Sequence, residues 1–167
     1  MNVKVRALVI TFVMAAVAAA DRAPAQGIIV PRDVAICHEI LTDTLNYTQA
    51  VTKESDTIAY VKEGSIVVLK LDGQYHVYGG GVSIMPRHDT APYLAQALIY
   101  AVLQMRLGRP TTMEEAFNKM YAVQTVIGSN LRKADKTILR AEGLGFIAEK
   151  DRSKLAVRVV IYIPGDK

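Results

Sequence analysis

Apolar residues recur at intervals of three and four in several stretches of the chain, which is typical of helices with one buried face. Val34, Cys37 and Leu41 follow this spacing and predict a helix over residues 32–51. Residues 93–107 are apolar on almost every side, which predicts a central, buried helix. Gly108 and then Pro110 predict its end.

The following segment carries a helix start signal. Thr112 and Glu115 have the spacing of a capping box, and Met113, Ala116 and Ile127 supply an apolar stripe. The Gly-Ser-Asn sequence at 128–130 breaks this pattern. A third late helix is therefore predicted over residues 131–142, with Gly143 and Gly145 stopping it.

Apolar and polar residues alternate with a period of two elsewhere, which predicts strands. Residues 65–71 and 74–78 flank Asp72-Gly73, a pair typical of a two-residue type I′ hairpin. That turn would place Leu71 opposite Gln74 and Val67 opposite Tyr78. Residues 57–62 predict a preceding strand, and residues 145–149 and 154–163 predict a second hairpin.

The predicted order is α-β-β-β-α-α-α-β-β, which indicates an α+β fold. We expect an antiparallel sheet built from hairpins and packed against three or four helices. No internal repeat divides the chain, so residues 26–167 are predicted to form a single domain.

The first 25 residues have the pattern of a cleavable signal peptide. Lys4 and Arg6 precede an apolar stretch at 7–20, and Ala23-Pro24-Ala25 matches a small-x-small cleavage site, with residues 18–20 as a second possibility. The stretch is too short to cross a bilayer comfortably, although a buried or membrane helix is the alternative interpretation. The pattern predicts a periplasmic or secreted protein with no stable membrane span after cleavage.

Composition and charge narrow the classes further. Hydrophobic residues make up 51% and charged residues 22% of the chain, which is too apolar for a disordered protein. Residues 26–105 hold 5 basic and 8 acidic residues, a net of −3, whereas residues 106–167 hold 12 and 7, a net of +5. The basic character is therefore concentrated in the C-terminal part, which hints at an interaction surface there.

The predicted helix at 131–142 carries the most specific feature of the sequence. Arg132, Lys136 and Arg140 are spaced by four residues, so they would line one helix face at a repulsive cost, which suggests an anionic partner. An ordinary solvated face is the alternative. Adding basic residues beside them and at the second hairpin's tip gives a candidate partner-binding set: Arg132, Lys133, Lys136, Arg140, Lys150, Arg152 and Lys154.

This region resembles the second half of a winged-helix DNA-binding domain. The resemblance rests on the capped helix beginning Thr112-Met113-Glu114-Glu115-Ala116, the stretch Lys136-Thr137-Ile138-Leu139-Arg140, and the hairpin entered through Gly143-Leu144-Gly145-Phe146-Ile147. It implies that a basic helix enters the major groove and that a basic hairpin tip contacts phosphate. The same basic residues would then face DNA, with Lys150, Arg152 and Lys154 on the wing.

A second candidate site follows the first predicted hairpin, where three consecutive glycines would allow close backbone approach to a ligand. The possible ligand-loop residues are His76, Gly79, Gly80, Gly81, Ser83 and His88. No helix starts directly after the glycines, so this is not a phosphate-binding loop, and a bulge or flexible loop is the alternative.

Metal and nucleophile patterns are weak. The spacing of His38, His76 and His88 does not place two of them on one helix or strand face, so neither a metal site nor a cofactor is expected. Cys37 precedes His38, but adjacent helix positions point in different directions, and a buried core cysteine is the favoured interpretation.

These patterns favour an exported, non-enzymatic binding protein, an envelope or secretion accessory factor whose partner is another protein or an anionic surface. A nucleic-acid-binding domain of winged-helix type is the first alternative. A small secreted hydrolase that uses Cys37, or Ser83 with a histidine, is the second.

Overall fold

A computed structural model of the chain describes residues 30–85, 89–152 and 156–165. The predicted signal peptide at residues 1–25 lies outside these ranges. The elements in chain order are α2 (Arg32–Glu39), a π-helix η1 (Ile40–Thr44), β1 (Thr48–Ala50), β2 (Thr57–Lys62), β3 (Ser65–Leu71), β4 (Val77–Ile84), α3 (Ala91–Arg106), α4 (Met113–Leu131), β5 (Lys136–Ala141), β6 (Leu144–Asp151) and β7 (Ala156–Tyr162).

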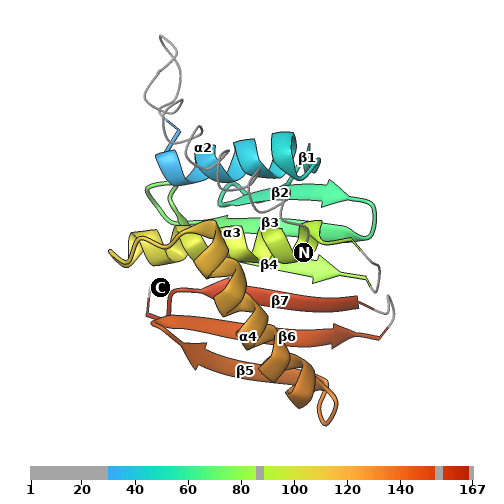
Figure 1. The fold of residues 1–167 in the computed structure, drawn as a ribbon. Helices are drawn as coiled ribbons and strands as arrows, with labels where there is room; N and C mark the ends of the chain where they lie inside the picture. Colours follow the sequence, from blue (N-terminus) through green and yellow to red (C-terminus); the bar gives the residue numbers. More distant parts are fainter. Residues whose placement is uncertain (1–29, 86–88, 153–155, 166–167) are drawn as a thin grey trace.

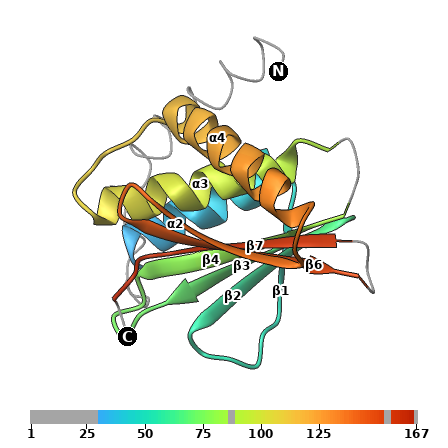
Figure 2. The same ribbon diagram turned by 90° about the horizontal axis from the view of Figure 1, so that it is seen from below.

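All seven strands form one antiparallel sheet in the order β1-β2-β3-β4-β7-β6-β5 (Figure 1). Helices α2, α3 and α4 all lie on the same side of this sheet, and no helix of the described ranges lies on its other face (Figure 2). The predicted α+β class with an antiparallel sheet is confirmed. The chain's first four strands meet its last three where β4 pairs with β7, at the middle of the sheet.

Helix α3 is central because its sequence is apolar on nearly every side. Leu98, Ile99 and Leu103 are fully or almost fully buried against the sheet. Gly80 of β4 permits this close packing, because a Cβ there would lie 3.0 Å from the Ile99 side chain. Burial of the apolar side chains of α3 stabilises the folded state, as the apolar pattern of its sequence predicts.

The first predicted helix is shorter than expected. Its last turn widens into η1, where the Leu45 N–H donates to the Ile40 carbonyl at 3.0 Å, and the chain then enters β1 at Thr48. The poor helix formers Thr42, Thr44 and Thr48 are consistent with this early end.

The capping box of α4 is confirmed, with Thr112 accepting from the Glu115 N–H and Glu115 accepting from the Thr112 N–H. The predicted break at 128–130 is wrong, and α4 continues to Leu131. Burial of Ile127 and Leu131 on its inner face outweighs the cost of about 1 kcal/mol for Gly128 inside a helix.

The predicted helix at 131–142 is also wrong, because residues 136–141 form the edge strand β5. Spacing of four residues is ambiguous: it places Lys136 and Arg140 on one side of a helix and also on one side of a strand. Glu142 and Gly143 lie at the end of the predicted helix but form a two-residue hairpin turn with φ values of 52° and 81°. These positive φ values are those of the type I′ turn expected elsewhere.

The register expected around Asp72-Gly73 is wrong as well, since Leu71 pairs with Val77 and Val67 with Val82. The Asp72 carboxylate accepts from the Gln74 and His76 N–H groups, both at 2.9 Å, and so builds a longer turn in place of a type I′ turn. The second predicted hairpin is confirmed as β6–β7, with Gly145 opposite Tyr162 and Asp151 opposite Ala156.

Candidate binding surface on the open face of the sheet

The face of the sheet opposite the helices has a continuous apolar row at its centre. Strand register aligns one residue from each of the seven strands across the full width of the sheet. These residues are Ala50, Ala59, Val68, Gly81, Val160, Ile147 and Ile138. The row gains further apolar surface from Val61 and Ile66, which are 39% and 44% exposed. A face of this kind is a candidate interaction site.

The middle of this open face is hollowed into a groove of about 900 Å³ over β3, β4, β7 and β6. Gly79 and Gly81 keep its floor low, because neither residue adds a side chain there. Tyr162 lies along the groove and covers Gly145, where a Cβ would come within 2.4 Å of the Tyr162 ring. The groove is therefore formed by glycines beneath larger apolar neighbours.

The predicted ligand loop does not exist as a loop, because Gly79, Gly80 and Gly81 lie inside the central strand β4. Gly79, Gly80 and Gly81 all line the groove from within this strand, together with Ser83. His76 lies at the other end of β4, where its Nδ1 is 3.1 Å from the buried Asp33 carboxylate. His88 lies outside the described residues.

Charged residues surround the groove on the side of β5, β6 and β7, and most of them are paired. Arg158 bonds to Glu149 at 3.1 Å, and Arg152 bonds to Asp135 at 2.6 Å. The hydrogen bond from Arg152 lowers the pKa of the Asp135 carboxyl, with Lys150 adding a further favourable charge at 3.8 Å. Lys150 and Arg152 of the predicted partner-binding set are therefore occupied within the chain.

Lys136 and Arg140 differ from these neighbours, because neither side chain bonds to any residue in the described part of the chain. Both are exposed on the open face of β5, on either side of Ile138, which is 60% exposed. Glu149 is the cross-strand neighbour of Lys136, but its Oε2 accepts from Arg158. Two uncompensated cations thus flank an exposed apolar side chain.

The remaining members of the predicted partner-binding set are Arg132, Lys133 and Lys154. Arg132 and Lys133 form the exposed turn between α4 and β5, and their side chains also have no bonding partner within the described ranges. Lys154 lies outside those ranges. The structure therefore brings four of the predicted basic residues to one edge of the sheet, although on a turn and a strand and not on a helix.

The backbone of β5 is available at this edge. The Lys150 N–H donates to the Asp135 carbonyl at 2.9 Å, which sets the alternation of an antiparallel ladder. Thr137 and Leu139 accordingly direct their backbone groups toward β6. Lys136, Ile138 and Arg140 direct theirs away from the sheet, so their unpaired N–H and C=O groups and their open-face side chains share one edge.

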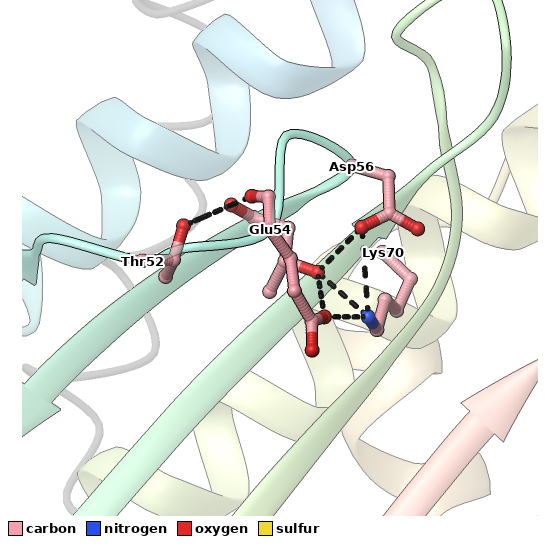
Figure 3. A network of polar contacts seen from close by, with 5 residues as sticks. Thr52, Glu54, Asp56 and Lys70 are labelled. Carbon is pink, nitrogen blue, oxygen red and sulfur yellow. Dashed lines mark hydrogen bonds and ion pairs between the residues drawn. The ribbon is translucent and has the colours of Figure 1, made fainter.

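Lysines on the opposite half of the sheet are paired. Lys70 of β3 bonds to Glu54 at 2.6 Å and to Thr57 at 2.7 Å, and lies 3.7 Å from Asp56 (Figure 3). The hydrogen bond from Lys70 lowers the pKa of the Glu54 carboxyl. Lys62 of β2 likewise lies 3.2 Å from Asp89. On this half of the sheet, lysine side chains therefore form ion pairs within the chain.

The candidate nucleophiles are poorly placed for chemistry. Cys37 is completely buried in the core, as expected, and burial raises the pKa of its thiol, which disfavours the thiolate. Ser83 lies near the end of β4 distant from His76, about 20 Å away at the rise of an extended strand. No group of three or more metal-ligating side chains occurs within residues 30–85, 89–152 and 156–165.

The sequence contains local signals that indicate strand β5. Thr137 and Ile138 have the β-branched side chains typical of strands, and Glu142-Gly143 is a two-residue link between two such runs. Interpreting that link as a turn would have predicted β5. Ile147, Val160 and Tyr162 could not be assigned to the groove without knowing which face the helices cover.

No known protein family, curated protein or solved structure matches the chain. Among the described helices, none is both long and apolar enough to cross a membrane.

Proposed function

We propose that this chain is an exported, non-enzymatic binding protein that engages a partner through the open face of its sheet. The observation that carries the proposal is the apolar row, which no described helix covers. The row crosses the sheet and ends at Ile138 of β5, between two cations that pair with no residue in the described ranges. An apolar centre with a polar rim is typical of protein interaction surfaces.

The charge distribution favours a partner with acidic groups. Arg158, Arg152 and Lys150 already form ion pairs with carboxylates, whereas Lys136 and Arg140 form none with any described residue. An acidic partner would be steered toward this edge and fixed in register by the two charges. The role of an envelope or secretion accessory factor remains a proposal that rests on the predicted signal peptide.

The two alternatives lose support from specific residues. The stretch 136–140, which resembled the DNA-contacting helix of a winged-helix domain, is a strand, so no helix presents these residues to a major groove. The hydrolase alternative relied on Cys37, which is buried, or on Ser83, which lies far from His76.

Site-specific photocrosslinking in the native cell tests the proposed surface. A photoreactive amino acid replaces Ile66 or Ile138 on the open face, and Tyr93 or Tyr121 on the helices, with exposures of 44%, 60%, 41% and 70% respectively. We expect both open-face positions to give the same identified protein adduct. The two helix positions, matched in exposure, should give little of it. Adducts confined to Tyr93 and Tyr121 would contradict the proposal.

Export is tested separately by N-terminal sequencing of the protein from its native cell fraction. Cleavage after Ala25 predicts a chain that begins at Gln26, and cleavage after Ala20 predicts one that begins at Asp21. A chain that still begins at Met1 in the cytoplasmic fraction would contradict export while leaving the binding surface untouched.

A further inference from the structure

We infer that the binding partner adds an extended segment to the free edge of β5, as an eighth strand, and that this segment carries acidic residues on both sides of an apolar one. The inference rests on the proposed function and specifies the mode of binding and the partner's chemistry. Strand addition of this kind gains its affinity from backbone hydrogen bonds and its specificity from alternate side chains.

The backbone supplies the first argument. Lys136, Ile138 and Arg140 present N–H and C=O groups away from β6, and none of these groups bonds to a described residue. The edge is six residues long. None of the described helices lies over the open face of the sheet (Figure 2). An incoming strand would satisfy both donors and acceptors, which an isolated phosphate group could not.

Side-chain spacing supplies the second argument. Residues four apart on a strand are separated by about 13 Å, so the two cations of β5 lie on either side of Ile138 at that interval. An extended partner with the pattern acid-x-apolar-x-acid repeats the same interval on the same face. Each of its side chains then meets an opposite charge or an apolar neighbour.

Self-association of this edge is disfavoured by the same charges. If two copies of β5 paired antiparallel about Ile138, Lys136 of each copy would face Arg140 of the other. Like charges directly opposite one another destabilise a strand pair. The edge therefore rejects a second copy of itself and favours a chain of opposite charge.

A labelled peptide of sequence Thr-Glu-Thr-Val-Thr-Glu-Thr serves as the probe, and its binding to the full chain is followed by fluorescence polarisation. A peptide with lysine at both glutamate positions is the charge control. A peptide N-methylated at both glutamates and the valine keeps the side chains but removes the backbone donors. We expect each control to bind at least about tenfold more weakly than the probe.

Variants of the protein test the same contacts from the other side. The double variant Lys136→Glu, Arg140→Glu should lose the acidic peptide and prefer the lysine peptide. Ile138→Pro removes only an N–H that points away from the sheet, so it should weaken binding at least about tenfold, while Ile138→Thr keeps that N–H and should retain most binding. Circular dichroism verifies the fold, and the charge reversal carries the test if the proline variant misfolds.

Three results would overturn the inference. The first is no binding of the acidic peptide. The second is binding that N-methylation and Ile138→Pro leave unchanged, which would indicate side-chain attraction alone. The third is tighter association with phosphatidylglycerol vesicles than with the peptide, insensitive to Ile138→Pro, which would assign the edge to a lipid surface. In each case, crosslinking at Ile66 still tests the proposed function independently.

Discussion

The two edges of the sheet differ in length, charge and pairing. Strands β1 and β5 form the two edges (Figure 1). Strand β1 has three residues and no charged side chain, whereas β5 has six residues and two cations on its open face. On the half of the sheet that ends at β1, Lys62 of β2 and Lys70 of β3 are held by carboxylates, as Figure 3 shows for Lys70. Lys136 and Arg140 have no such partner in the described structure.

This difference shows that the number of basic residues does not identify a binding surface. A basic side chain that already has a carboxylate partner stabilises the fold, whereas one without such a partner can bind another molecule. Very short edge strands and charged edges both limit unwanted strand pairing. The short β1 edge uses the first device. The β5 edge uses the second, and its charges also select a partner of opposite sign.

The largest expected effect comes from reversing the charges on the β5 edge. In native cells, Lys136→Glu with Arg140→Glu should reduce the crosslinked adduct at Ile66 by about a hundredfold, because attraction becomes repulsion at two positions. The control change Lys62→Met removes a cation of β2, next to the β1 edge and outside the groove lining, and should leave the adduct intact. Equal losses in both variants would show that general charge, and not the β5 edge, determines binding.

A second comparison concerns the glycines under the open face. Gly145→Ala places a Cβ 2.4 Å from the Tyr162 ring, so the tyrosine must move, at an expected cost of about 1–3 kcal/mol in the free energy of unfolding. A Cβ at Gly81 meets Val160 Cγ2 at 3.4 Å and the Val159 carbonyl oxygen at 3.7 Å, which are ordinary contact distances, so Gly81→Ala should change this free energy by less than about 0.5 kcal/mol. Urea denaturation measures both, and a larger loss for Gly81→Ala would contradict the described packing.

The smallest expected effect is on pH-dependent stability. The pKa of Glu54 is lowered by its hydrogen bond from Lys70, so the resulting stabilisation is present above the unfolded-state pKa and is lost as pH falls through the folded-state pKa. Lys70→Met should therefore flatten the fall in melting temperature below about pH 4.5. Lys136→Met should leave the profile parallel to that of the unmodified protein.

The expected difference between Lys70→Met and Lys136→Met has its own controls. Added salt should narrow the difference between Lys70→Met and the unmodified protein, because the Lys70 pairs are exposed and screened. A steeper acid profile for Lys136→Met than for Lys70→Met would mean that Lys136 has a carboxylate partner in the folded protein.

Much of the fold follows from local signals in the sequence. The capping box of Thr112 and Glu115 predicted the start of α4, and the all-round apolar pattern predicted a buried α3. The errors arose where one pattern fits two structures. Asp72 and Glu142 both precede a glycine, but only Glu142-Gly143 forms the tight turn.

Contacts far apart in the sequence determine that outcome. The Asp72 carboxylate also accepts from Arg106 of α3, at 2.9 Å, which holds the longer turn. Glu142 is anchored to the helices by hydrogen bonds from Tyr100, at 2.5 Å, and from Lys119. These bonds keep Glu142 in a positive φ conformation that is unfavourable for a residue other than glycine.

The candidate site was predictable as a set of residues but not as a surface. The spacing of basic residues predicted Arg132, Lys133, Lys136 and Arg140 as one group, and the structure brings these four to one edge. The pairing of Lys150 and Arg152 with Asp135 could not be deduced, because it depends on the β5–β6 register. The same applies to the apolar row, which crosses all seven strands.

Residue-resolved hydrogen exchange of the full chain with the acidic peptide tests the central claim most directly. The amides of Lys136, Ile138 and Arg140 point away from β6, so they should exchange rapidly in the free protein and slow markedly when the peptide is bound. The amides of β1, at residues 48–50, should not change. Slowing at β1 with none at β5, or no slowing at either edge, would contradict the account.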